Sequence, residues 1–171
     1  RLVVLTGAGM SAESGISTFR DSGGLWDKYP VEQVATPEGF RANPELVLNF
    51  YNIRRRELLS VKPNEGHYGL VDLEKHFEVN IITQNIDNLH EQAGSSSVIH
   101  LHGELMKSRS TADESLVYDI DPEKCEILLG DTCEKGSQLR PHIVWFGEMV
   151  PMMSVAEEIT RKADIFVIIG T

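Results

Sequence analysis

The sequence predicts an α/β protein built on a parallel sheet, with helices on both faces of the sheet and one small inserted module. Short apolar runs typical of buried strands alternate with segments of helical pattern. Polar residues suited to ligand binding follow directly after strands, where open α/β sheets bind their ligands. A polar, turn-rich stretch at residues 104–140 interrupts the alternation and predicts the module.

The individual elements follow from the apolar pattern and from residues that begin or end helices. Strands are expected at residues 2–5, 79–82, 98–101, 142–146 and 165–171, the last of them buried. Helices are expected at about residues 7–16, 44–60, 65–76 and 153–163, with a short helical segment that ends at Gly94. Asn43 can cap the helix at 44–60, and Pro44 suits its first position. A long loop that contains Gly23 and Gly24 is expected before that helix.

Composition limits the classes of function. With 171 residues and 41% apolar content, the chain is expected to form one globular domain. Its net charge of -10 argues against nucleic acid and membrane surfaces as partners, because both attract a basic face. Arg54, Arg55 and Arg56 are a local exception, and the last two are expected to be solvated. No apolar stretch approaches membrane-spanning length, and the chain opens on a strand-like run without a charged lead and cleavage site, so a cytoplasmic location is expected. Cys125 and Cys133 lack the number and spacing of a disulfide framework, so free thiols are expected.

The first chemical motif is Gly-Ala-Gly-Met-Ser-Ala at residues 7–12, which fits G-x-G-x-x-G/A between a strand and a helix. Glycines there let the backbone approach a pyrophosphate, and the helix amino terminus offers free N–H groups. The same glycines can serve a steric purpose alone. An ordinary dehydrogenase would carry an acidic residue at the end of a second strand about 20 residues further on. Residues 19–26 instead read as a polar, glycine-rich loop, which disfavours hydride transfer.

Two more motifs begin where strands stop. Residues 83–90 read Thr-Gln-Asn-Ile-Asp-Asn-Leu-His, and residues 100–103 read His-Leu-His-Gly. They place amides, a carboxylate and imidazoles at the ends of neighbouring strands. Asn and Asp after a strand can also simply cap the next helix, as Asp87 could do at Leu89.

With these motifs in this order, the chain closely resembles the sirtuins, the family of NAD-dependent protein-lysine deacylases. The motifs that carry the resemblance are Gly-Ala-Gly-Met-Ser-Ala-Glu-Ser-Gly-Ile with Phe19-Arg20, Thr-Gln-Asn-Ile-Asp, His102-Gly103, Val-Trp-Phe-Gly-Glu at 144–148, and the closing Gly170-Thr171. The resemblance implies a Rossmann-like domain of residues 1–103 and 141–171, with the small module at 104–140 as the counterpart of the family's zinc module. Because the family continues past its Gly-Thr, a domain truncated at its C-terminus and a longer natural protein are expected.

The reaction that the resemblance implies consumes NAD. Nicotinamide leaves, the acyl oxygen of a modified lysine attacks the exposed ribose carbon, and the acyl group passes to the ribose. The resemblance makes His102 the base that deprotonates a ribose hydroxyl, and an imidazole suits this role because its ordinary pKa lies close to working pH. Asn85 is implied as the second catalytic residue, where its amide helps to hold ribose and water.

NAD is the implied cofactor, and its implied contacts come from several motifs. They are Gly7, Ala8, Gly9, Ser11, Ala12, Phe19, Arg20, Gln84, Asn85, Asp87, Gly170 and Thr171. Asp87 would accept from the nicotinamide carboxamide and Gln84 would contact the ribose. Phe19 would shield the reactive ribose carbon from water, and Arg20 would order its loop. A loop phenylalanine packed on the body beside a solvated arginine is the alternative.

Acylated-lysine proteins are the implied substrates. The residues implied to pair with the substrate backbone as an added strand are Val144, Trp145, Phe146 and Gly147; an ordinary core strand is the alternative. Tyr51 and Arg54 share a helix face, and arginine can grip a carboxylate with two parallel hydrogen bonds. This Tyr-x-x-Arg, with Ala35 as the small pocket residue, resembles the sirtuin subgroup that removes succinyl, malonyl and glutaryl groups. An aromatic core residue beside a solvated arginine is again the alternative.

The inserted module departs from the family, because most sirtuins hold zinc there with four cysteines. Only Cys125 and Cys133 are present, and the segment 107–110 offers hydroxyls where a first cysteine pair would fall. Since structural zinc needs about four nitrogen or sulfur ligands, no metal is expected. The module is then expected to be held by Leu116, Val117, Tyr118, Ile127, Leu128 and Leu129. A non-catalytic NAD- or ADP-ribose-binding module, and the disfavoured Rossmann dehydrogenase, stay as alternatives to a deacylase.

Overall fold

The computed structural model describes residues 1–18 and 24–171, and the chain divides into two compact units. Unit 1 consists of Arg1–Asp21, Val61–Gly103 and Met149–Thr171. Unit 2 consists of Ser22–Ser60 and Glu104–Glu148. The stretch expected as a small module therefore lies within unit 2, together with the segment Ser22–Ser60.

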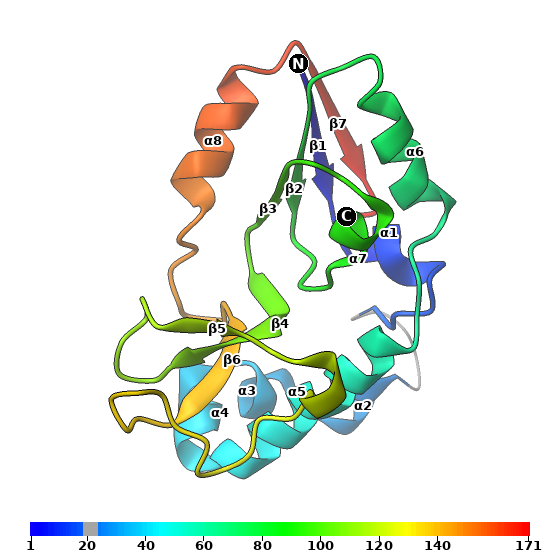
Figure 1. Ribbon diagram of the computed structural model, residues 1–171. Coiled ribbons are helices and arrows are strands. Elements are labelled where there is room, and N and C mark those ends of the chain that lie inside the picture. Colours follow the sequence, from blue (N-terminus) through cyan, green and yellow to red (C-terminus); the bar gives the residue numbers. More distant parts are fainter. Residues whose placement is uncertain (19–23) are drawn as a thin grey trace. The chain divides into compact units, whose positions relative to one another are not determined.

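Unit 1 is built on a four-stranded parallel sheet with the order β3-β2-β1-β7 (Figure 1). The strands are β1 (Leu2–Thr6), β2 (Val79–Thr83), β3 (Val98–His100) and β7 (Ile165–Ile169). β1 lies inside the sheet, where Leu2 pairs with Val79 on one side and with Ile165 on the other. This sheet confirms the α/β class that the alternation of strands and helices predicted.

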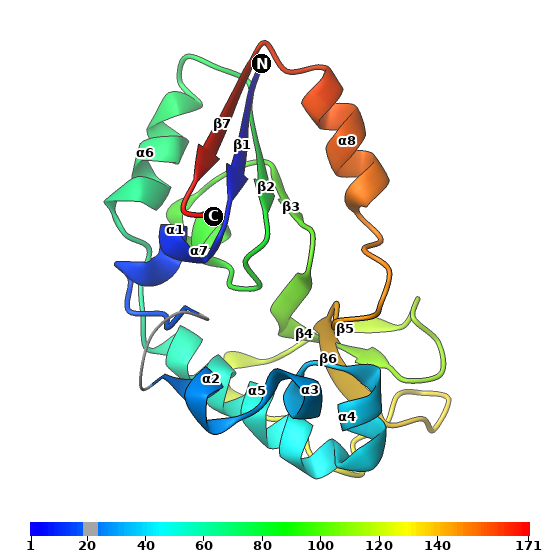
Figure 2. The same cartoon turned by 180° about the vertical axis from the view of Figure 1, so that it is seen from behind.

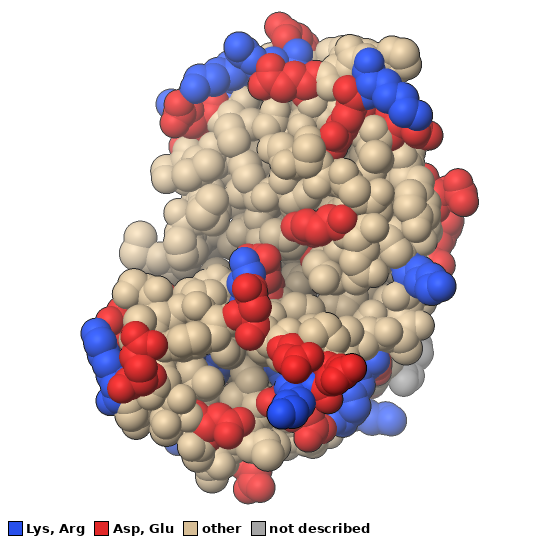
Figure 3. All heavy atoms as spheres, in the orientation of Figure 1, with Lys and Arg blue, Asp and Glu red and all other residues tan. Residues whose placement is uncertain are grey.

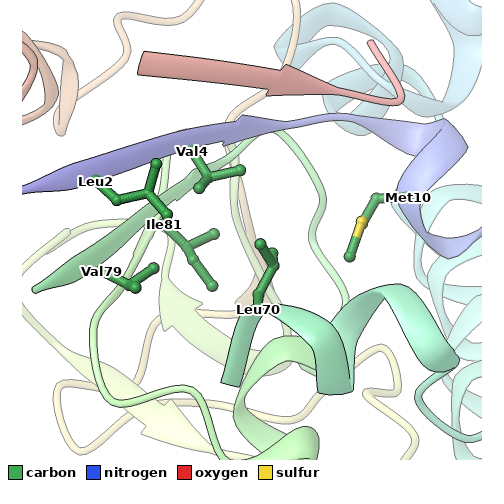
Figure 4. Packing of buried hydrophobic residues seen from close by; sticks show 6 residues of the cluster. All are labelled: Leu2, Val4, Met10, Leu70, Val79 and Ile81. Carbon is green, nitrogen blue, oxygen red and sulfur yellow. The ribbon is translucent and has the colours of Figure 1, made fainter. Parts of the chain in front are cut away.

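Helices cover both faces of this sheet. They are α1 (Ala8–Ala12), α6 (Glu65–Leu73), α7 (Leu89–Ala93) and α8 (Met153–Arg161), with α6 and α8 on opposite sides (Figures 1 and 2). Because successive side chains of a strand point to opposite faces, neighbouring residues of β1 join different clusters. Val4 packs in the cluster that contains Leu70 of α6 (Figure 4), and Val3 packs in the cluster that contains Ala156 of α8.

Three elements predicted from the sequence were wrong in extent, place or burial. α1 ends at Ala12 and not near residue 16, because the chain turns there and Gly15 adopts a left-handed φ of 100°. The strand expected at 142–146 is β6 (Leu139–Ile143), which belongs to a sheet of unit 2. β7 is not buried: Ile168 is 58% exposed, because β7 is an edge strand of the described sheet.

Unit 2 combines a three-stranded sheet with helices. The sheet has the order β5-β4-β6, with β4 (Gly103–Ser110) antiparallel to β5 (Val117–Asp119), and a 3₁₀ turn, η1 (Pro122–Lys124), follows. The helices are α2 (Leu25–Lys28), α3 (Val31–Val34), α4 (Pro37–Ala42) and α5 (Pro44–Leu59). α5 confirms the expected helix, since the Asn43 side chain accepts from the N–H of Leu46 at 3.0 Å. The first three helices occupy the expected loop, and runs of four to six residues are too short to show a helical period.

Arg55 is not solvated, as the sequence suggested, but fully buried on the inner face of α5. Its Nε donates to the carbonyl oxygen of Leu105 at 2.9 Å, and its Nη1 donates to the carbonyl oxygen of Cys125 at 3.1 Å. Burial lowers the pKa of Arg55 to about 10. This arginine thus joins α5 to β4 and to the segment that follows η1, while Arg56 is exposed.

The apolar residues expected to hold the 104–140 stretch do so only in part. Ile127 is buried, whereas Leu128 and Leu129 are more than half exposed. Polar contacts join the turns instead: Lys135 pairs with Asp113 at 2.6 Å, and the hydroxyl of Tyr118 donates to Glu134 at 2.9 Å.

The sequence argued against nucleic acid and membrane surfaces as partners, and this stays a prediction. On the face shown in Figure 3, basic side chains lie among acidic ones. None of the helices in the described ranges combines the length and apolar character needed to cross a bilayer.

Candidate active site

His102 lies just beyond β3 and is anchored to the turn after β2. Its Nδ1 lies 3.0 Å from the carbonyl oxygen of Gln84. Because a carbonyl oxygen only accepts, Nδ1 must carry the hydrogen, and the neutral ring then keeps a lone pair on Nε2. The imidazole is thereby held in the tautomer that a general base needs.

Asn85 ties the same turn to the glycine motif. Its side-chain Nδ2 donates to the carbonyl oxygen of Gly7 at 2.9 Å, and its backbone N–H donates to the Thr83 hydroxyl at 3.0 Å. The residue is buried, so both bonds are protected from competition with water. The amide is therefore fixed at the place where β1 and β2 end side by side.

Asp87 both caps a helix and contacts the glycine motif. Its Oδ1 accepts from the N–H of Leu89 at 3.1 Å, as the capping alternative expected. Its Oδ2 accepts from the Ser11 hydroxyl at 2.9 Å. Capping and a place in the candidate site coexist, and the carboxylate is only 5% exposed.

Two buried histidines also contact these residues and the end of β1: His67, which the sequence analysis did not single out, and His90, which ends the 83–90 motif and was given no role of its own. Nδ1 of His67 accepts from the N–H of Asn64 at 3.1 Å, so its Nε2 carries the hydrogen and lies 3.5 Å from the Ser11 oxygen. Nε2 of His90 lies 3.1 Å from the Thr6 oxygen. Burial lowers the pKa of His67 and that of His90, the latter to about 4. A usable signal for His67 was its position three residues after the helix cap Asn64.

The glycines of the first motif serve a steric purpose as well. A Cβ on Gly9 would lie 2.9 Å from the Cα of Gly170, and a Cβ on Gly7 would lie 2.8 Å from the Gly170 oxygen. Gly170 itself has a φ of +65°, which favours glycine. The next residue, Thr171, accepts from Nε2 of Gln84 at 2.9 Å. The two ends of β1 and β7 thus meet backbone to backbone, with Gln84 beside them.

The predicted NAD contacts that the structure describes gather in unit 1. Gly7, Ser11, Gln84, Asn85, Asp87, Gly170 and Thr171 are linked by the contacts above, while Ala8, Gly9 and Ala12 are exposed on the same turn and helix. Bare backbone beside fixed amides and a buried carboxylate suits the phosphates, ribose and carboxamide of NAD. Phe19 and Arg20 lie outside the described residues.

The predicted acyl-binding residues form an aromatic cluster in unit 2. Nε1 of Trp145 donates to the hydroxyl oxygen of Tyr51 at 3.0 Å, and both residues are buried. Burial raises the pKa of Tyr51 to about 12, so its hydroxyl is a neutral donor. The guanidinium carbon of Arg54 lies 5.9 Å from the centre of the Tyr51 ring. Ala35 is buried close by, where its carbonyl oxygen accepts from the N–H of Phe146 at 3.0 Å.

The segment after β6 is a turn and not a core strand. Val144 to Gly147 lies beyond the last residue of β6, and Gly147 has a φ of +89°. Glu148 closes the turn by accepting from the N–H of Trp145 at 2.8 Å and from Arg140 at 2.7 Å. Burial would raise the pKa of Glu148, but Arg140 and the other donors hold it below its ordinary value. Phe146 is left 59% exposed.

The residues of the 104–140 stretch do not fit a zinc site. Sγ of Cys133 lies 3.3 Å from the Ser110 hydroxyl oxygen, and Cys125 and Cys133 are both free thiols. Among the residues outside 19–23, no group of three or more His, Cys, Asp or Glu side chains could hold a metal ion. Structural zinc needs about four such donors in a tetrahedral arrangement. That the protein binds no zinc remains a prediction.

Comparison with known proteins identifies the class to which this fold and these residues belong. Residues 7–171 match the model of the Sir2 family. The "NAD-dependent protein deacylase" of Bacteroides thetaiotaomicron is 64% identical over 173 residues, which cover 99% of this chain and 74% of the relative. That of Helicobacter pylori J99 is 54% identical and covers 99% and 71%. The chain belongs to the Sir2 family, the sirtuins, and is an enzyme of that family.

Solved structures agree with this assignment. The crystal structure of a Sir2 homologue in complex with NAD has a TM-score of 0.87 and 43% identity, covering 99% of this chain and 67% of that one. A complex of a Sir2 homologue variant with ADP-ribose has a TM-score of 0.89 and 42% identity, covering 99% and 69%. The Rossmann-like fold and the dependence of the family on NAD are therefore supported.

Proposed function

We propose that this chain removes acyl groups from protein lysines in an NAD-dependent reaction that releases nicotinamide and passes the acyl group to ADP-ribose. The observation that carries the proposal is His102, whose Nδ1–H is bonded to the Gln84 carbonyl so that Nε2 can accept a proton. When bound, NAD supplies the ribose carbon at which nicotinamide is replaced. The family assignment and the names of the relatives support the same activity.

The described residues have separate roles in this proposal. His102 removes a proton from a ribose hydroxyl, which prepares that oxygen to attack the acyl group. Asn85 orients ribose and water, and Gln84 contacts the ribose. The Asp87 carboxylate accepts from the carboxamide of nicotinamide, with Ser11 holding one of its oxygens at 2.9 Å. Because these groups are fixed before the substrate arrives, little ordering is left for the reaction itself.

We further propose that the enzyme prefers acyl groups that end in a carboxylate, in addition to removing acetyl. The Tyr51 oxygen accepts from Trp145, so its own hydrogen can be donated to a second acceptor. Arg54 lies three residues further along α5 and is always charged at working pH. A phenol and a guanidinium together supply three donors for succinyl, malonyl or glutaryl groups, whereas acetyl offers them no acceptor of that kind.

The protein substrate is proposed to pair with the turn at 144–147. Main-chain pairing gives affinity with little dependence on sequence, so a broad range of acylated proteins is expected. The exposed Phe146 ring gives such a substrate an apolar contact. No nucleic acid or membrane partner is proposed, and a cytoplasmic location suits this set of substrates.

The test uses the full chain with NAD and matched acetyl-lysine and succinyl-lysine peptides, followed by mass spectrometry. Release of nicotinamide with O-acyl-ADP-ribose supports the deacylase. Reduced-cofactor absorbance would indicate a dehydrogenase instead, and binding of NAD without turnover would indicate a non-catalytic module. Arg54→Met should abolish desuccinylation and spare deacetylation. Equal loss of both activities would contradict the carboxylate role.

A further inference from the structure

Arg54 is surrounded by aromatic rings from two helices of unit 2. Its guanidinium carbon lies 5.2 Å from the centre of the Trp26 ring on α2, 5.8 Å from that of Phe50, and 5.9 Å from that of Tyr51. A guanidinium this close to a ring face is attracted by the π electrons. The nearest of these rings, Trp26, comes from outside the helix that carries Tyr51 and Arg54.

Trp26 is itself fixed by packing. Its ring meets the ring of Phe50 edge to face, with centroids 4.8 Å apart, and Phe50 in turn packs edge to face on Tyr51 at 5.1 Å. Phe50 and Tyr51 are fully buried, while Trp26 is half-buried. The buried Phe50 ring, which is itself packed on Tyr51, therefore supports the Trp26 indole, and the indole contacts the Arg54 guanidinium.

The contact matters because an arginine side chain loses rotamer freedom when it is held in one place. A guanidinium already held near Tyr51 binds a carboxylate at a lower entropic cost than one that must first be ordered. The attraction to a ring face acts on the guanidinium as a whole, so it is compatible with bidentate hydrogen bonds to a carboxylate.

We infer that Trp26 is a specificity-determining residue, which positions Arg54 for acyl groups that carry a terminal carboxylate. The inference rests on the proposed preference for such groups. Trp26 is a positioning residue and touches no reacting atom, so its loss changes the selectivity between acyl groups and not the deacylation chemistry.

The test compares kcat/KM for matched succinyl-lysine and acetyl-lysine peptides in three variants of Trp26 and its neighbour. Trp26→Leu should lower the succinyl-to-acetyl ratio about two- to fivefold, which corresponds to a cation–π contact at a partly exposed position. Trp26→Phe keeps a ring and should restore most of the ratio. Tyr29→Leu is the matched control: Tyr29 packs on the same Phe50 ring at 5.4 Å, and it is not among the three rings that the described residues place over Arg54.

The outcomes separate this inference from the proposal beneath it. A wild-type enzyme that removes acetyl but no succinyl overturns the acyl preference itself. If the wild type removes succinyl and Arg54→Met does not, an unchanged ratio in Trp26→Leu overturns the role of Trp26. Equal loss of both activities in Trp26→Leu also overturns it, since that pattern shows packing alone.

Discussion

The indole N–H of Trp145 donates to the hydroxyl oxygen of Tyr51 across 3.0 Å, and the two residues are 94 positions apart in the chain. This bond joins α5 to the turn after β6 within unit 2. It also sets the direction of the phenol, since the oxygen that accepts from the indole must point its own hydrogen elsewhere.

Tyr51→Phe removes the acceptor of a buried N–H, because Trp145 is only 2% exposed. Leaving such a donor unpaired costs about 1–3 kcal/mol. We expect a loss of unfolding free energy in that range in urea titrations, and a lower succinyl-to-acetyl kcat/KM ratio. An unchanged ratio with lowered stability would show that the phenol serves packing alone.

His102→Gln keeps a side chain that can bond to the Gln84 carbonyl but has no basic nitrogen. A general base contributes about 10²- to 10⁴-fold to the rate, so kcat for deacylation should fall by that order. The readout is O-acyl-ADP-ribose formed from NAD and an acetyl peptide. His102 is only partly buried, so the melting temperature should change little. Activity within tenfold of wild type would refute its role as base.

Stability should fall as the pH drops from about 6.5 to about 4. Burial, reinforced by His67, lowers the pKa of His90 to about 4 from an ordinary 6.5. Between these values the unfolded chain binds the proton and the folded chain does not, so acid favours unfolding. The loss due to His90 is on the order of 3 kcal/mol when complete.

The measurement is the unfolding free energy across this pH range for the wild type and for His90→Gln. The variant has no group to titrate at this position, so its slope should be shallower. Equal slopes would show that other groups cause the acid sensitivity. His67, whose pKa burial also lowers, should add to the slope in both proteins.

Removal of metal should have no effect on this protein. The turns that contain Ser110 and Cys133 are joined by hydrogen bonds and by the pair of Asp113 with Lys135. We therefore expect the same melting temperature with and without EDTA, and far less than one equivalent of zinc by metal analysis. One bound equivalent, or a large drop in stability with the chelator, would contradict this.

Elements of both units could be predicted from local patterns. The apolar run at 79–82 and the cap Asn43 act through neighbouring residues, so they gave strand β2 and helix α5 close to their observed bounds. The strand expected at 142–146 was misplaced because the bounds of β6 depend on its pairing with β4. That pairing is a tertiary contact, which no local pattern encodes. Arg55 was misjudged for the same reason, since the two backbone carbonyls that accept from it are 50 and 70 residues away.

The candidate site was predictable where a motif carries several groups at once. Asn85 and Asp87 were found because they stand together after a strand, and the structure adds their bonds to Gly7 and Ser11. His67 was not singled out, and His90 was given no role of its own although it ends the 83–90 motif, because a single histidine carries no local pattern that shows its burial. Their importance comes from burial next to Ser11 and Thr6, which is a property of the fold.

The glycine contact at the tip of β7 has a consequence for ligand binding. Gly7 donates its N–H to Ile169 at 3.1 Å, and Gly9 donates to Gly170 at 2.8 Å, so this weakly covered strand is fastened to the turn that NAD is proposed to occupy. A molecule that binds the folded turn more tightly than the unfolded chain must slow the local opening of everything attached to it. The amide hydrogens of β7 would then exchange with solvent more slowly in the presence of dinucleotide. Their exchange rate would show whether the turn has bound its ligand.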